Sequence, residues 1–182
     1  MSLTVDAAGV ITGIRYLPSP NCDERPSGIN IELLVIHNIS LPPGEFGGPA
    51  IIDLFMNRLN PAAHPYYQGI AHLKVSAHFL IRRDGELLQF VSCQKRAWHA
   101  GQSAWRARER CNDYSIGIEL EGADDLPFED AQYTMLARLI PALRSAYPVL
   151  DIVGHSDIAP ARKTDPGPCF DWPRLRESLP AD

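Results

Sequence analysis

A short, almost wholly apolar run constrains the fold of this chain more than any other feature. Residues 31–38 read IELLVIHN, and the apolar part of the run ends at His37. A run this short, with this density of aliphatic side chains, does not suit a helix and is typical of a strand that is buried on both faces. The sequence therefore predicts a sheet that is covered by other elements on both sides.

Further strands are predicted on both sides of this run. Apolar, β-branched segments lie at 10–16, 114–122 and 150–155. Residues 76–92 predict a hairpin, because two such runs flank Asp84 and Gly85, the pair that favours a type I′ turn. Residues 17–30, 41–48 and 60–75 predict loops, and 95–113 allow no assignment.

Helices are predicted at three places between and after these strands. Residues 49–59 and 128–147 carry apolar side chains at helical spacing, and Pro141 predicts a kink or a break in the second helix. A short C-terminal helix should begin at Asp171 as N-cap, with Pro173 just inside it. The order of elements predicts the α/β class, in the mixed α+β form of a central mixed β-sheet flanked by helices.

Length and charge limit the classes of protein to which this chain can belong. Its 182 residues suit one domain spanning 1–182, and the formal net charge of −5 argues against a nucleic-acid partner. No window approaches the roughly 18 apolar residues of a membrane span, and the N-terminal segment lacks the pattern of a secretory signal. The four cysteines form no C-x-x-C pair, which favours free thiols and a cytoplasmic location.

Two histidines stand where predicted strands should end. His37 and His155 each follow an apolar run, and ligands gather outside strand ends in open α/β sheets. Two histidines with one carboxylate form a recurrent catalytic zinc set, and Asp165 lies on the same proline-rich loop as His155. The residues alone leave other roles open: His37 as a hydrogen-bonded core histidine, and Asp165 as a turn former before Pro166.

Two glutamates near the end of strand 114–122 are candidates for proton transfer. The alternation of side chains along a strand places Glu119 and Glu121 on one face, opposite Ile116, Ile118 and Leu120. The pattern does not decide which of the two glutamates faces a cleft.

Five long segments carry a resemblance to a known family. They read LLVIHNISLPPGEFGG, HFLIRRDG, RAWHAG, RERCNDYSIGIELEG and GHSDIAPARKTDPG. Together they resemble the AmpD-type 1,6-anhydro-N-acetylmuramyl-L-alanine amidases of bacterial cell-wall recycling, whose wider relatives are the phage-type amidases and the peptidoglycan recognition proteins. The resemblance implies a sheet flanked by helices, with Zn²⁺ at the floor of a groove and a soluble anhydro-muropeptide as substrate.

The resemblance also implies roles for individual residues. The zinc ligands fall on His37, His155 and Asp165, the catalytic glutamate on Glu119 and the catalytic lysine on Lys163. Ala77 stands where phage-type relatives usually carry a tyrosine, which fits a glutamate-dependent mechanism.

Four further residues are predicted to contact the substrate. Arg110 matches a position that the family uses for peptide carboxylates, and Lys74 stands where close relatives tend to carry arginine. Trp98 and Asn38 are expected beside the groove. Alternative roles stay open for three of them: a surface arginine at 110, a core tryptophan at 98 and a strand-capping asparagine at 38.

Other functions and residues remain open at this point. The rival functions are an amidase that acts on intact peptidoglycan and a muropeptide-binding module without catalysis. Residues 41–75 include a possible lid, because the region is long and rich in Gly and Pro. His78 is predicted to be structural and His64 and His72 receive no role, whereas His99 could face the groove but is not expected to be a ligand.

Overall fold

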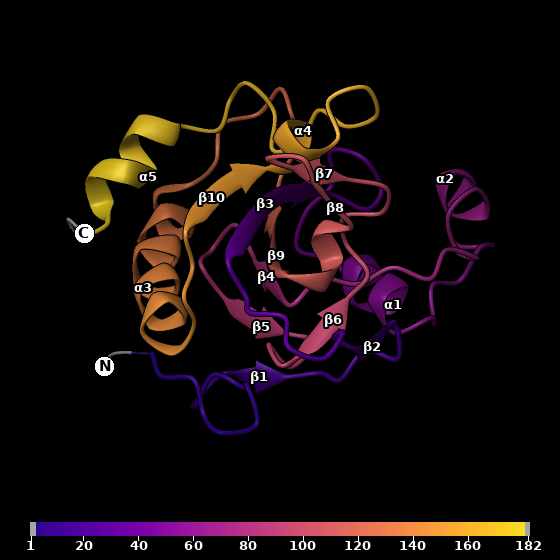
Figure 1. The fold of residues 1–182 in the computed structure, drawn as a ribbon. Coiled ribbons are helices and arrows are strands. Elements are labelled where there is room, and N and C mark those ends of the chain that lie inside the picture. Colours follow the sequence, from indigo (N-terminus) through magenta and orange to yellow (C-terminus); the bar gives the residue numbers. More distant parts are fainter. Residues whose placement is uncertain (1–2, 181–182) are drawn as a thin grey trace.

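The computed structural model describes residues 3–180, and a six-stranded sheet forms its centre (Figure 1). The strands stand in the order β1, β5, β4, β9, β3, β10, and all neighbouring pairs are parallel except the antiparallel pair of β4 and β5. The strand bounds are β1 Arg15–Tyr16, β3 Leu33–Ile39, β4 Phe79–Ile81, β5 Leu87–Gln89, β9 Ser115–Glu121 and β10 Asp151–Gly154. The prediction of a central mixed sheet flanked by helices is confirmed.

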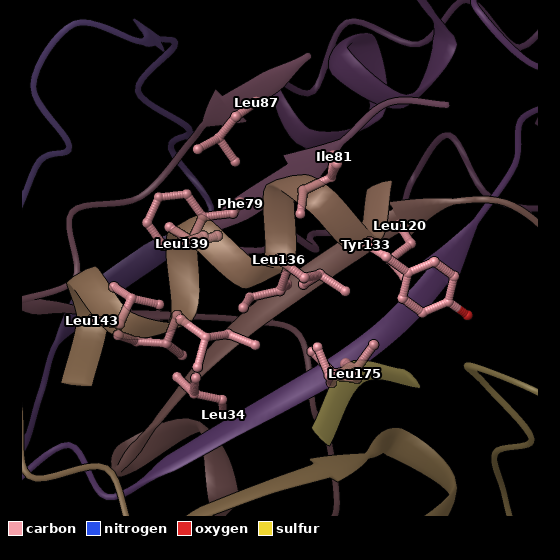
Figure 2. Packing of buried hydrophobic residues seen from close by; sticks show 14 of the residues in the cluster. Leu34, Phe79, Ile81, Leu87, Leu120, Tyr133, Leu136, Leu139, Leu143 and Leu175 are labelled. Carbon is pink, nitrogen blue, oxygen red and sulfur yellow. The ribbon is translucent and has the colours of Figure 1, made fainter. Parts of the chain in front are cut away.

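One face of the sheet is covered by α3, Asp130–Ala146, and by α5, Trp172–Ser178 (Figure 1). Figure 2 shows leucines of α3 pointing toward Phe79, Ile81 and Leu34 of the sheet. Ile116, Ile118 and Leu120 belong to the same core, so the predicted alternation along β9 is confirmed.

The opposite face is covered by α1, Ala50–Phe55, by α4, His155–Ile158, and by loops. Leu33 and Val35 of β3 point to this side, away from the α3 core, and the alternation of β3 brings His37 to the same side. The central strand is therefore buried on both faces, as its composition predicts.

The helices differ in length from their predictions. α1 is shorter than 49–59, because Met56 ends it and Asn57 has a φ of 57°. α3 continues through Pro141 as one helix, so the alternative of two helical segments is wrong. Asp171 caps α5 as predicted, since its Oδ1 accepts a hydrogen bond from the Arg174 backbone N–H at 2.9 Å.

The prediction of a type I′ turn at Asp84-Gly85 is wrong. Gly85 has a φ of 85°, whereas Asp84 does not have a positive φ. The Gly85 N–H donates to the Arg82 carbonyl and the Arg82 N–H donates to the Glu86 carbonyl, which is the three-residue loop with a bulge at glycine. Asp84 instead accepts a hydrogen bond from the Glu86 N–H at 2.9 Å, which a short aspartate makes readily in a turn.

Segments that the sequence left irregular contain short pairings. Two small antiparallel pairs form, β2 Cys22–Glu24 with β6 Lys95–Ala97 and β7 Ala104–Trp105 with β8 Arg108–Glu109, and the remaining elements are α2 Pro65–Gln68 and the 3-10 turn η1 Cys111–Asp113. The predicted strand 10–16 is reduced to β1 and a single bridge between Val5 and Ile11. All four cysteines are free, as predicted, and no helix within residues 3–180 is long and apolar enough to cross a bilayer.

Candidate metal centre and groove

Three predicted ligands converge at one end of the central strands. His37 lies on β3, His155 begins α4 directly after β10, and the parallel register that pairs Gly154 with Ile36 brings the two histidines together. The Nδ1 atoms of His37 and His155 are 2.9 Å apart, and Asp165 Oδ2 lies 3.0 Å from the first and 3.1 Å from the second. The three atoms therefore form a nearly equilateral triangle.

The hydrogen bonds behind this triangle make it suitable for a cation. His155 Nε2 lies 3.1 Å from the Ala100 carbonyl, which can only accept, so this carbonyl supports the tautomer that has its proton on Nε2 and a lone pair on Nδ1 for a cation. Nδ1 of His155 then turns that lone pair toward a carboxylate and a second imidazole nitrogen. A cation satisfies this set of acceptors, and two histidines with one carboxylate are a typical zinc donor set.

A stiff loop carries Asp165 back to the histidines. The Ser156 N–H donates to the Asp165 carbonyl at 2.9 Å, and Pro166 packs so closely on Gly154 that a Cβ there would lie 2.8 Å from the proline ring. The side chains of His37, His155 and Asp165 are 2%, 3% and 13% exposed. The three ligand side chains are thus largely buried.

Burial and neighbouring charges shift the pKa values of His37 and Asp165. Burial lowers the pKa of His37 to about 4, against the opposing effect of Asp165. Burial also opposes ionisation of Asp165, but its contacts with His155 and His37 outweigh that effect and hold the pKa of Asp165 below its ordinary range. The site therefore favours neutral imidazole and ionised carboxylate, the forms that bind metals.

Of the two glutamates on β9, only Glu119 lines the groove. It stands opposite His37 in the strand register, is 9% exposed, and its Oε2 has no hydrogen-bond partner among the described residues. Burial, aided by the charge of Asp165, raises the pKa of Glu119 well above its ordinary value, while Lys163 opposes the shift. Glu121 is instead paired with Arg82 at 2.8 Å and holds the Gly47 N–H.

A groove of about 370 Å³ opens over the three ligands. Lys163 and Glu119 line it beside the ligands, and Tyr66, Ile70 and Leu73 contribute apolar surface from α2 and the segment after it. Tyr66 and Leu73 are also 45% and 39% exposed, unusually so for large apolar side chains in this protein. Polar and charged groups therefore stand at the floor of the groove, and apolar groups form part of its wall.

The predicted substrate contacts divide into two groups. Asn38 and Trp98 line the groove, Asn38 donating to Asp124 Oδ1 at 2.6 Å and Trp98 Nε1 to Asp23 Oδ1 at 3.1 Å. Arg110 does not line it: its side chain is 69% exposed, 3.2 Å from Asp113, beside a separate hollow of about 290 Å³. Lys74 is exposed and also absent from the lining. Substrate contact by these residues stays a prediction.

The sequence allowed His99, in the segment 95–113, to face the groove but gave it no contact with a metal ligand. Its Nδ1 is 2.9 Å from His37 Nε2, and it lines the groove. The only available signal was its place in the segment RAWHAG, because the surrounding residues have no periodicity. His78 is buried and held by the Gly117 N–H and the Lys95 carbonyl, in agreement with the structural role predicted for it.

Comparison with known proteins places this geometry in a family. Residues 27–168 match the family of N-acetylmuramoyl-L-alanine amidases. The 1,6-anhydro-N-acetylmuramyl-L-alanine amidase AmpD of Citrobacter freundii is 60% identical over 170 residues, which cover 92% of this chain and 91% of that protein.

Two solved structures are also similar. A crystal structure of a selenomethionine AmpD derivative superposes with a TM-score of 0.93 at 58% identity, covering 95% of this chain and 98% of that one. The Escherichia coli amidase AmiD, in complex with the substrate anhydro-N-acetylmuramic acid-L-Ala-D-gamma-Glu-L-Lys, gives a TM-score of 0.62 at 29% identity over 99% of this chain and 67% of that one. The chain therefore belongs to the N-acetylmuramoyl-L-alanine amidase family.

Proposed function

We propose that this protein is a zinc-dependent amidase of cell-wall recycling, a single domain over residues 1–182 that works in the cytoplasm. Its reaction is the hydrolysis of the lactyl amide between 1,6-anhydro-N-acetylmuramic acid and L-alanine in soluble muropeptides. The observation that carries the proposal is the convergence of His37 Nδ1, His155 Nδ1 and Asp165 Oδ2 at 2.9 to 3.1 Å. The names and the high identity of the AmpD relatives support the choice of substrate.

Each residue of the site has a part in this reaction. Zinc held by the two histidines and Asp165 would polarise the amide carbonyl and lower the pKa of a bound water to about 7. Glu119 accepts a proton from the attacking water and returns it to the leaving nitrogen as the carbon–nitrogen bond breaks, a transfer worth about a hundred- to ten-thousand-fold in rate. Lys163 lies beside the same groove, where its charge stabilises the carbonyl oxygen as it becomes negative.

The substrate is an anionic sugar–peptide, and the groove offers surfaces for both parts. Tyr66, Ile70 and Leu73 supply apolar surface. Asn38 and Trp98 contact the substrate inside the groove, and Arg110 and Lys74 bind peptide carboxylates that extend beyond it. Their exposed positions suit flexible contact with a charged peptide rather than fixed contact with the reacting amide.

The decisive experiment combines metal analysis with an amidase assay on soluble anhydro-muropeptides. We expect about one zinc per chain, loss of hydrolysis on chelation and recovery on adding zinc. Asp165→Ala should lose both metal and activity, whereas Lys163→Met should keep the metal and lose turnover. Equal or faster hydrolysis of intact sacculi would favour the peptidoglycan-degrading alternative. Binding of muropeptide without any hydrolysis by the zinc-loaded protein would favour the non-catalytic module.

A further inference from the structure

The ring of His99 stands between His37 and a buried serine. Its Nδ1 is 2.9 Å from His37 Nε2, and its Nε2 is 3.0 Å from Ser115 Oγ. The rings of His37 and His99 meet edge to face, with their centroids 5.0 Å apart and their planes at 87°. The three side chains thus form a linear series of hydrogen bonds that ends at the candidate metal ligand.

A glycine on β9 fixes the place of this ring. A Cβ built on Gly117 would lie 2.5 Å from His99 Cγ and 2.6 Å from Nδ1, closer than real Cβ atoms approach. The ring therefore packs directly on the strand backbone, between the flanking residues Ser115 and Glu119. No other type of residue at position 117 leaves room for the ring in this position.

The backbone at His99 is held as firmly as the ring. Asn112 Oδ1 accepts hydrogen bonds from the N–H groups of both His99 and Ala100, at 3.2 and 2.8 Å. The Ala100 carbonyl in turn lies 3.1 Å from Nε2 of His155. One two-residue segment therefore contacts the outer nitrogen of each histidine ligand.

We propose that His99 is a positioning residue that sets the coordinating tautomer of His37. When His99 carries its proton on Nε2 and donates it to Ser115, its Nδ1 can only accept, which favours a His37 with its proton on Nε2 and Nδ1 free for a metal. The Asp165 carboxylate, 3.0 Å from His37 Nδ1, favours the opposite tautomer of His37 until a cation binds it. With the opposite tautomer His99 donates to His37 Nε2, and a neutral His37 is then protonated on Nδ1 and cannot bind. The inference rests on the zinc centre of the proposed function.

His155 has a backbone partner instead, because its Nε2 lies 3.1 Å from the Ala100 carbonyl, which can only accept and supports the coordinating tautomer. The two ligands are therefore oriented by different means from adjacent residues: a carbonyl for His155 and a side chain for His37. Only the second can be altered by substitution without rebuilding the backbone, so His99 is the residue to test.

Asparagine and leucine form a matched pair of substitutions. They have the same shape, but the Asn amide oxygen can occupy the place of His99 Nδ1 and accept from His37, whereas Leu offers no acceptor. We expect His99→Leu to weaken zinc binding by about ten- to a hundredfold, as the loss of such partners usually does, and His99→Asn to restore most of it. Ser115→Ala, which removes the hydrogen-bond partner of His99 Nε2, should fall between the wild type and His99→Leu.

The measurement is zinc affinity, from competition with a chelator of known strength, together with thermal unfolding of the zinc-free proteins. Nitrogen-15 NMR of zinc-free Asp165→Ala, which lacks the carboxylate 3.0 Å from His37 Nδ1, gives the His37 tautomer directly, with the proton expected on Nε2 when residue 99 is His or Asn. His64→Leu is the control for adding a leucine, since His64 lies outside this series, where it caps α2 and contacts the ring of Tyr67.

The results separate the inference from the function on which it rests. A wild-type protein that binds no zinc refutes the proposed function and the inference with it. Wild-type zinc binding with equal affinities for the wild type and His99→Leu overturns the inference alone. Equal losses of zinc affinity in the Leu and Asn variants, with His37 still protonated on Nε2, would mean that His99 acts only by packing. That result overturns the inference as well.

Discussion

The two glutamates of β9 lie two residues apart on one face of one strand, and the structure predicts opposite outcomes for the same substitution in each. Glu119 lines the groove with an oxygen that has no hydrogen-bond partner within residues 3–180, whereas Glu121 is in an ion pair. Replacing each by glutamine changes one charge and almost no volume. The pair of variants therefore separates the catalytic role of a carboxylate from its structural role.

Glu119→Gln should remove activity without loss of stability. Losing the proton-transferring group costs about a hundred- to ten-thousand-fold in rate. The pKa of Glu119 is raised by burial, so in the zinc-free protein the folded state holds its proton more tightly than the unfolded state does. Burying this carboxyl group therefore destabilises the folded state at neutral pH, and the effect fades as the pH falls to the ordinary carboxyl range. The glutamine variant should be more stable than the wild type at pH 7 and lose this advantage in acid.

Glu121→Gln should reduce stability and leave the chemistry in place. Its side chain is 2% exposed and that of Arg82 is 10% exposed, and their atoms meet at 2.8 Å. Breaking such a buried pair costs about 3 to 5 kcal/mol, and we expect about 3 because Arg82 keeps the Gly48 carbonyl and Glu86. For a domain of this size that loss lowers the melting temperature by roughly 6 to 12 °C. Turnover at a temperature where the variant is folded should stay within about threefold, because Glu121 touches no group at the metal centre.

Thermal unfolding of the zinc-free proteins and hydrolysis of anhydro-muropeptide by the zinc-loaded proteins test this pair. The reasoning is refuted if Glu119→Gln melts several degrees below the wild type, since its carboxylate would then be a structural partner. It is equally refuted if Glu121→Gln melts normally but loses turnover, which would make Glu121 the catalytic base.

Three further predictions follow from other parts of the chain. The pKa of buried His78 is lowered to about 3 by burial and by Arg25, so below pH 6.5 the unfolded chain binds a proton that the folded chain does not. From this group, urea unfolding of the zinc-free protein should show about 2 kcal/mol less stability at pH 5 than at pH 7. Unchanged stability over that range would contradict the assignment. Ala107 has a φ of 63°, so Ala107→Gly should stabilise the protein by about 1 kcal/mol in the same assay, whereas the control Ala104→Gly in β7 should not. Adding zinc to a hundred times its Kd should raise the free energy of unfolding by about 2.7 kcal/mol, and Asp165→Ala should abolish that gain.

The composition and alternation of a few neighbouring residues were enough to predict the central strands of the sheet. The apolar run at 31–38 and the alternation at 114–122 predicted the two central strands, because a buried strand needs a distinct composition over only a few residues. The pairing of β2 with β6 could not be predicted, since it joins mostly charged residues about 70 positions apart and has no apolar pattern. The turn between β7 and β8 has a type I′ conformation at Arg106 and Ala107. It was not predicted, because neither position holds the Asn or Gly that favours this turn.

The site shows the same division between local and long-range information. His37 and His155 could be expected at a ligand site because each ends an apolar strand, but only the parallel register of β3 and β10 brings them together. The choice between Glu119 and Glu121 depended on Arg82, which is distant in sequence and is fixed by the β4–β5 hairpin. The contact of His99 with a metal ligand could not be predicted, because its ring partners, His37 and Ser115, come from other segments.

The arrangement of these elements explains how a small domain can hold a reactive centre rigidly. Three adjacent parallel strands, β10, β3 and β9, deliver His155, His37 and Glu119 side by side, so their spacing is set by the sheet rather than by loops. Only Asp165 and Lys163 arrive on a loop, and hydrogen bonds to Ala159 and Ser156 together with the packing of Pro166 on Gly154 limit its movement. Because the positions of two ligands and the proton-transferring carboxylate are already fixed in the fold, ordering the site on metal binding costs little conformational entropy. The same reasoning explains why a single histidine on the neighbouring segment is enough to set the last free variable, the tautomer of His37.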